Sequence, residues 1–199
     1  MKKIVALLLA ITMAFLFVGC QTTEISRGTI DGDTYKNENL SFEFTKPESW
    51  VYSTDEEIAE AINIGVENFG NESFKKALEN NTSVYDMMVV DSLTRTNINV
   101  GYENLSKTFS RNITEEQYIE ALEEQLNSVT SMQVTFPDEY DTVKLGQTEF
   151  TRVICPVTAS GVSMTQVYYL HKIDGYMGFV IVTINFDGYT VADIEAMFK

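Results

Sequence analysis

Two residues could together supply nucleophilic chemistry in this 199-residue chain: Cys155 and the only histidine, His171. In such a pair the imidazole would take the proton of an attacking thiol. Cys155, however, alternates with Val153 and Val157, a pattern typical of a small side chain buried on one face of a strand. His171 lies beside a predicted hairpin turn, where a solvated side chain is the ordinary outcome. We therefore interpret Cys155 as structural and predict no catalytic residue and no enzymatic activity.

The spacing of potential metal ligands does not match a known metal motif. A single histidine excludes a His-His ligand pair and the HExxH zinc motif. The stretch DGDT at 31–34 begins like a calcium-binding EF-hand loop, but Tyr35 and Lys36 stand where that loop needs an oxygen ligand and a glycine. The acidic faces expected on two helices are interpreted as solvated surface. We predict no metal site and no cofactor.

The first residues have the features of an export signal. Two lysines precede Ile4–Val18, an uncharged apolar run that is shorter than the roughly 20 residues of a membrane span. The stretch FVGC that follows resembles the bacterial lipoprotein signal, in which the cysteine after the cleavage site is acylated, although Phe17 replaces the usual leucine. We predict that residues 1–19 are a lipoprotein signal peptide and that Cys20 is lipidated. The alternative is an uncleaved N-terminal anchor helix.

The mature chain would be strongly acidic. Removal of residues 1–19 takes away two lysines, so the formal net charge of −15 becomes −17. A surface of that sign repels nucleic acid and anionic lipid headgroups, so neither is an expected direct partner. The membrane is instead expected to be a partner through the lipid on Cys20. Cys155 then has no second cysteine for a disulfide, and the fold must depend on its hydrophobic core.

The polar stretch QTTEISRGTIDGDT has no sustained helical or strand period. Residues 20–34 are therefore expected to be the lipidated N-terminus and a flexible tether. Residues 35–199 are enough for one domain and too few for two.

Three helix starts are predicted within this domain. Thr54 with Glu57, and Thr114 with Gln117, have the spacing of a capping box, and Thr190 precedes the stretch VADIEAMF. The stretch SFKKALEN predicts a further short helical piece. The apolar stripes of the two longer helices are expected to comprise Ile58, Ile62, Gly65, Val66 and Phe69, and Tyr118, Ile119, Leu122, Leu126 and Val129.

Strands are predicted for LSFEF, SVYDMMVVDSL and TNINVGYENL, the second of which is apolar enough to be covered on both faces. Five more are predicted at 132–135, 142–145, 147–157, 162–172 and 176–184. Asp174-Gly175 between two apolar runs is a strong hairpin signal. Adjacent hairpins imply antiparallel pairing, so the expected fold class is α+β, an antiparallel sheet flanked by helices.

The order and spacing of several stretches resemble small Gram-positive lipoproteins with a PsbP-like fold. The stretches are YKNENLSFEFTKPESW, DMMVVDSLTRTNINVGYENL, TEEQYIEALEEQL, VKLGQTEFTRV and YYLHKIDGYMGFVIVTI. That fold is shared with a photosystem II extrinsic protein and a Ran-GTPase release factor. The resemblance implies an α/β/α sandwich over residues 35–199. It also implies an accessory or binding role, because characterised members are mostly not enzymes. No functional residue is carried over.

Aromatic residues near one strand-to-helix turn form the candidate ligand groove. Trp50, Tyr52 and Phe42, with Phe44 close by, could line it, although such clusters more often belong to the core.

We therefore expect a lipid-anchored, extracytoplasmic lipoprotein on the extracellular face of the cell membrane. The expected role is a non-catalytic binding or accessory module of the envelope, acting on a protein or small ligand. The alternatives are an extracellular hydrolase without a recognisable motif and a structural envelope component.

Overall fold

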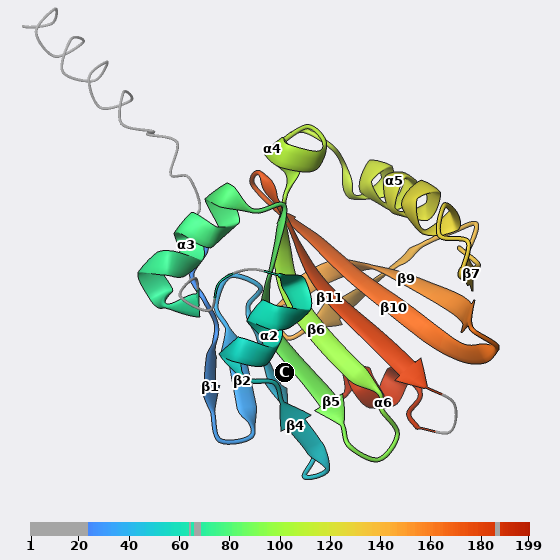
Figure 1. Cartoon of the computed structure of the whole chain (residues 1–199), viewed down its shortest axis with the longest axis horizontal. Coiled ribbons are helices and arrows are strands. Elements are labelled where there is room, and N and C mark those ends of the chain that lie inside the picture. The colour runs from blue at the N-terminus through green and yellow to red at the C-terminus, as the bar shows by residue number, and fades with distance from the viewer. Residues whose placement is uncertain (1–23, 64, 66–68, 186–187) are drawn as a thin grey trace, which may run out of the picture.

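Two antiparallel sheets form the framework of the computed structural model, which describes residues 24–63, 65, 69–185 and 188–199 (Figure 1). The smaller sheet has the order β1–β2–β3, and the larger has the order β4–β5–β6–β11–β10–β9–β7, with β8 also paired to β9. The strands are β1 (Thr29–Asp31), β2 (Thr34–Asn37), β3 (Phe42–Thr45), β4 (Trp50–Tyr52), β5 (Ser83–Asp91), β6 (Asn97–Asn104), β7 (Met132–Val134), β8 (Asp141–Leu145), β9 (Thr148–Ala159), β10 (Val162–Ile173) and β11 (Tyr176–Asn185).

The turn residues of the sequence explain the C-terminal hairpins. Ile173 pairs with Tyr176, so Asp174 and Gly175 alone form the turn between β10 and β11. Asp174 takes a left-handed conformation with φ of 54°, which such a two-residue turn requires. The five strands predicted for the last third are confirmed, and their ends lie within two residues of the prediction.

The three predicted helix starts are confirmed, and each has a complete capping box. Thr54, Thr114 and Thr190 each accept a hydrogen bond from the backbone N–H three residues later, and the side chain of that residue accepts one in return. The helices are α2 (Asp55–Ile62), α3 (Asn71–Asn80), α4 (Leu105–Thr108), α5 (Glu115–Asn127) and α6 (Val191–Glu195).

The first helix is shorter than its apolar stripe predicted. α2 ends at Ile62 because Asn63 adopts the left-handed conformation, with φ of 56°, and closes the last turn. Of the remaining stripe residues, Val66 lies outside the described residues. Phe69 packs with Ile58 in one small cluster, so it is buried as predicted although it does not belong to the helix.

Helices cover both faces of the larger sheet, which confirms the predicted α+β class. On one face, here called the outer face, α2 lies over β5 and α5 lies over β10 (Figure 1). On the opposite, inner face, the smaller sheet, α3 and α6 enclose the main core. The sequence did not predict this second sheet. It takes the place of helices over much of one layer of the expected α/β/α sandwich.

β5 is covered on both faces, as its apolar run predicted. Tyr85 and Met88 pack under α2, opposite the main core. The strand also contains a bulge between Tyr85 and Met87, which leaves Asp86 without a partner in the ladder of β5 and β6. A bulge adds one residue to a strand and changes the direction in which its side chain points. Here it allows a charged side chain to enter the interior.

The expected flexible tether is wrong for residues 24–34. β1 pairs with β2, Ile25 is only 4% exposed within the main core, and Glu24 forms an ion pair of 2.5 Å with Lys75 on α3. Residues 20–23 lie outside the described residues. Two groups of this segment, the Arg27 guanidinium and the Gly28 N–H, lie against a buried carboxylate.

Asp86 is the centre of a buried polar network and is 2% exposed. Its carboxylate accepts hydrogen bonds from the Tyr35 hydroxyl at 2.6 Å and the Gly28 N–H at 2.9 Å, and lies 3.5 Å from Nε of Arg27. A Cβ at position 28 would lie 2.5 Å from the Tyr35 ring, so only glycine allows this approach. Burial raises the pKa of the Asp86 carboxyl, while these three partners oppose the rise.

Arg27 extends the network to the outer face. Its guanidinium pairs with Asp55 at the start of α2, with one N–H···O distance of 2.8 Å. It also donates to the Phe69 carbonyl at 2.8 Å and lies 5.0 Å from the centre of the Phe69 ring. The N-terminal segment therefore connects the smaller sheet, the β5 bulge and α2.

Asp86→Ala should lower the free energy of unfolding by about 1–3 kcal/mol for each of the two donors that it leaves without an acceptor, the Tyr35 hydroxyl and the Gly28 N–H. Asp141→Ala is the matched control: Asp141 pairs with Arg152 but its side chain is 57% exposed, and exposed pairs contribute about 0–1 kcal/mol. Urea unfolding of both variants measures the difference. Equal losses of stability would contradict the central role of Asp86.

Candidate functional site

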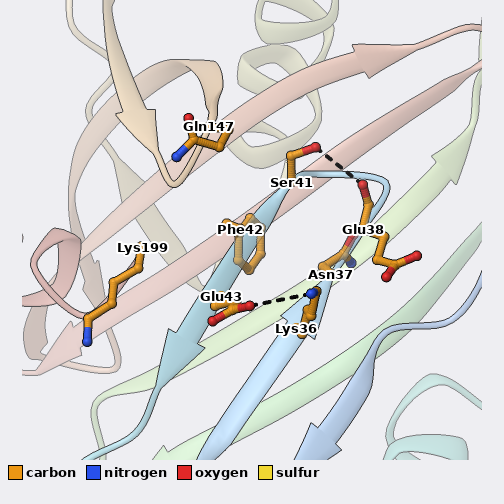
Figure 2. A pocket seen from close by; sticks show the side chains of 8 residues that line it. All are labelled: Lys36, Asn37, Glu38, Ser41, Phe42, Glu43, Gln147 and Lys199. Atoms are coloured by element: carbon orange, nitrogen blue, oxygen red, sulfur yellow. Dashed lines mark hydrogen bonds and ion pairs between the residues drawn. The ribbon is translucent and has the colours of Figure 1, made fainter.

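A hollow of about 490 Å³ opens between the smaller sheet, the β8–β9 turn and Lys199 (Figure 2). Three separate parts of the chain meet there. Its lining residues are Lys36 and Asn37 of β2, Glu38 and Ser41 of the β2–β3 turn, Phe42 and Glu43 of β3, Gln147 of the β8–β9 turn, and Lys199.

Backbone hydrogen bonds hold these parts together. Glu43 and Lys199 exchange two backbone bonds, of 2.9 and 2.8 Å, and the Gln147 N–H donates to the Ser41 carbonyl at 2.9 Å. Gly146 has φ of +60°, and a Cβ there would lie 2.6 Å from both the Phe42 Cβ and the Lys199 carbonyl oxygen. Glycine is therefore required for the β8–β9 turn to approach β3.

The hollow lies over the buried Phe42 and is bordered by charges of both signs. The Phe42 ring lies at its centre in Figure 2 and packs edge-on against Phe198 at 5.1 Å between ring centres. The Lys36 ammonium lies 3.5 Å from the Glu43 carboxylate, and both side chains are about half exposed. Exposed pairs of this kind are weak and rearrange at little cost. The site can therefore offer an ammonium, a carboxylate and the Gln147 amide to a small polar ligand or to a segment of another protein.

The structure brings one of the three predicted groove residues to this hollow. Phe42 and Trp50 are both buried in the main core, 2% and 1% exposed. Phe42 also borders the hollow, whereas the Trp50 indole N–H donates to the Tyr189 hydroxyl at 2.9 Å. Tyr52 is half-buried and donates to the Asp33 carbonyl at 3.1 Å, and burial raises its pKa to about 12. Trp50 and Tyr52 do not line this hollow.

Sequence reasoning missed the polar residues of the hollow. The glycine at 146 marked the turn that presents Gln147, so this residue could have been placed at a turn. No local pattern indicates that Lys199 pairs with β3, because that contact joins distant parts of the chain.

Cys155 and His171 lie on opposite faces of the larger sheet. Gln166 is the β10 partner of Cys155, so His171 lies five residues further along that strand, which corresponds to about 17 Å. Cys155 packs beneath α5 on the outer face, and His171 lies beside the Phe150 ring on the inner face, 5.6 Å between ring centres. The two residues do not form a thiol–imidazole pair.

Arg152 lies on the face opposite Cys155. Its guanidinium forms ion pairs with Asp141 and, at 2.7 Å, with Glu195 of α6. The Tyr169 hydroxyl also donates to Glu195, at 3.0 Å. Arg152 thereby attaches α6 to the inner face.

A second, more acidic hollow of about 470 Å³ lies at the start of α5. Among the residues that line this hollow, Glu115 has a structural role. The Glu115 carboxylate accepts hydrogen bonds from the Lys172 N–H at 2.9 Å and from the Thr151 hydroxyl. These bonds attach the helix to the sheet. Within the described ranges, no group of three or more His, Cys, Asp or Glu residues is placed to hold a metal ion.

The predicted lipidation site, Cys20, lies outside the described residues, as does the predicted signal peptide. Among the helices that the structure describes, none is long and apolar enough to cross a membrane.

Comparison of this chain with known proteins finds a structural similarity but no match in sequence. No family model matches it, and no curated protein matches it in sequence. In structure it is similar to the cyanobacterial PsbP protein (CyanoP) from Synechocystis sp. PCC 6803, solved in solution. The sequence identity is 10%, the TM-score is 0.47, and the match covers 92% of this chain and 98% of that one.

Thiol reagents should label Cys155 slowly in the native protein. Burial raises the pKa of Cys155 to about 12, so at pH 8 its thiolate fraction is about a thousandfold below that of an exposed cysteine. Labelling followed by mass spectrometry, with the urea-unfolded protein as the control, measures the ratio. Native labelling as fast as that of the unfolded chain would show that Cys155 is a reactive residue.

Proposed function

We propose that this chain is a small lipoprotein of the Gram-positive bacterial type, held on the extracellular face of the cell membrane by lipid on Cys20. Its folded domain acts there as a non-catalytic binding or accessory module for a protein or small ligand of the envelope. Two features support this proposal. Signal-like residues precede Cys20, and a residue only four positions after it already contacts the folded domain.

The anchoring part of the proposal is supported most directly by Glu24 and Ile25. Both already contact the folded domain, through Lys75 and the main core respectively. Only four residue steps separate Cys20 from Glu24, and these span at most about 14 Å. A lipid on Cys20 would thus hold the domain against the membrane surface.

The non-catalytic part is supported by the positions of the side chains that could take part in a reaction. The Cys155 thiol is buried and its pKa is raised to about 12. Asp86 is enclosed by its hydrogen-bond partners, and Arg152 is held in two ion pairs. Each of these groups stabilises the fold. The hollow at Phe42, with its weakly paired charges, suits binding better than chemistry.

The mature wild-type protein, extracted from membranes with detergent, should carry the mass of acyl chains on its N-terminal cysteine. Cys20→Ala should abolish that mass, because the thiol is the attachment point. Cys155→Ala is the matched control and should keep it. An unmodified Cys20 in the wild-type protein would contradict the lipoprotein assignment.

The hollow can be tested by placing a photo-crosslinking amino acid at Gln147 in intact cells. If the hollow receives a protein partner, crosslinking from this position should produce a defined adduct. The same amino acid at Glu124, on the exposed side of α5, should not produce it. Identical adducts from both positions would show that the hollow is not the binding place.

A further inference from the structure

The described chain begins at one end of the molecule, where α3, α4 and the β10–β11 turn meet. Glu24 pairs with Lys75 of α3, and the Asn104 side chain donates to the Leu78 carbonyl at 2.9 Å, joining α3 to the start of α4. The Leu105 N–H donates to the Gly175 carbonyl at 3.0 Å, which joins α4 to the turn. We call this the α3–α4 end.

The opposite end is formed by β4 and the β5–β6 turn (Figure 1). β6 runs between the two ends: Leu93 lies in the turn before it, and α4 follows it directly. Its eight residues separate the ends by about 26 Å. This is longer than the roughly 14 Å available between Cys20 and Glu24.

Basic side chains gather at the α3–α4 end. Lys75 and Lys76 are exposed on α3, Lys107 is exposed on α4, and Arg111 lies against the β10–β11 turn, where a Cβ on Gly175 would be 2.6 Å from its Nε. Acidic residues are present too, Glu24, Glu79 and Asp174 around one hollow and Glu72 and Glu103 on α3 and β6, so the basic charges at this end are matched by acidic ones.

The two helices of the outer face, α2 and α5, are negatively charged. α2 has acidic residues and no basic one, and the same holds for α5. Of these two helices, α5 begins beside the α3–α4 end, where its Tyr118 ring lies 5.7 Å from the Phe109 ring. Phe109, exposed at the end of α4, adds an aromatic side chain of the kind found at membrane interfaces.

We infer that the α3–α4 end is the membrane-facing end of the protein and contacts anionic lipid headgroups through the exposed Lys76 and Lys107, whereas Lys75 is paired with Glu24. This inference rests on the proposed lipidation of Cys20. The short connection brings this end to the bilayer, where the exposed lysines offset part of the repulsion between the acidic domain and the anionic surface. The earlier expectation from net charge alone, that anionic lipid is no direct partner, applies to the rest of the surface.

The test uses the lipidated protein reconstituted in phosphatidylglycerol-rich vesicles and in phosphatidylcholine vesicles. A fluorophore is attached at Ser110→Cys, between Lys107 and Arg111, or at Leu93→Cys, a position 79% exposed at the opposite end. Cys155 is buried and should not compete for the label. A spin-labelled lipid quenches fluorophores that lie near the headgroups.

On phosphatidylglycerol-rich vesicles the Ser110→Cys label should be quenched strongly and the Leu93→Cys label weakly. Lys76→Gln and Lys107→Gln should each lower the equilibrium constant for the docked orientation about fivefold, the factor that corresponds to about 1 kcal/mol for one basic residue near an anionic surface. Arg95→Gln makes the same charge change at the opposite end and should have no effect.

Equal quenching at both positions, or quenching at Ser110→Cys that is as strong on phosphatidylcholine, overturns the inference. The mass of Cys20 is measured on the same sample. Lipid present with equal quenching overturns only the orientation, whereas absent lipid overturns the proposed function on which it rests.

Discussion

A carboxylate can be buried in a protein only when donors replace the water that it loses. Asp86 meets this condition with groups from a segment that precedes it by more than fifty residues: the Tyr35 hydroxyl, the Gly28 N–H and the Arg27 guanidinium. Much of the remaining architecture depends on that exchange. It holds β1 and β2 against the larger sheet and, through Asp55, fixes the start of α2. The bulge in β5 exists at the position where the carboxylate must turn inward.

The same arrangement links the fold to the proposed function. Because the N-terminal segment is held by this network, the domain begins within a few residues of Cys20, which is the arrangement that the proposed anchoring and orientation need. The side chains most able to react are used for stability: Cys155 in the core beneath α5, and Arg152 between Asp141 and Glu195. What stays accessible is a hollow with weakly paired charges, which is suited to binding.

Several features could be predicted because they depend on neighbours along the chain. The capping boxes at Thr54 and Thr114 involve residues three positions apart, and the Asp174-Gly175 turn joins strands adjacent in sequence. The helical stripe ending at Phe69 shows the limit of such patterns. The periodicity correctly indicated burial, yet Asn63 ended the helix early by taking a left-handed conformation that the apolar stripe does not encode.

The sequence by itself determined the α+β class, most strand and helix positions, the buried state of Cys155 and the signal-like pattern before Cys20, since all of these arise from short-range spacing. Only the tertiary structure decided that residues 24–34 are part of the domain and that Phe42, but not Trp50, lines a hollow. A polar segment rich in threonine and glycine has the same composition whether water or a buried carboxylate satisfies its hydrogen bonds. That choice depends on a partner distant in the chain, and local patterns do not contain it.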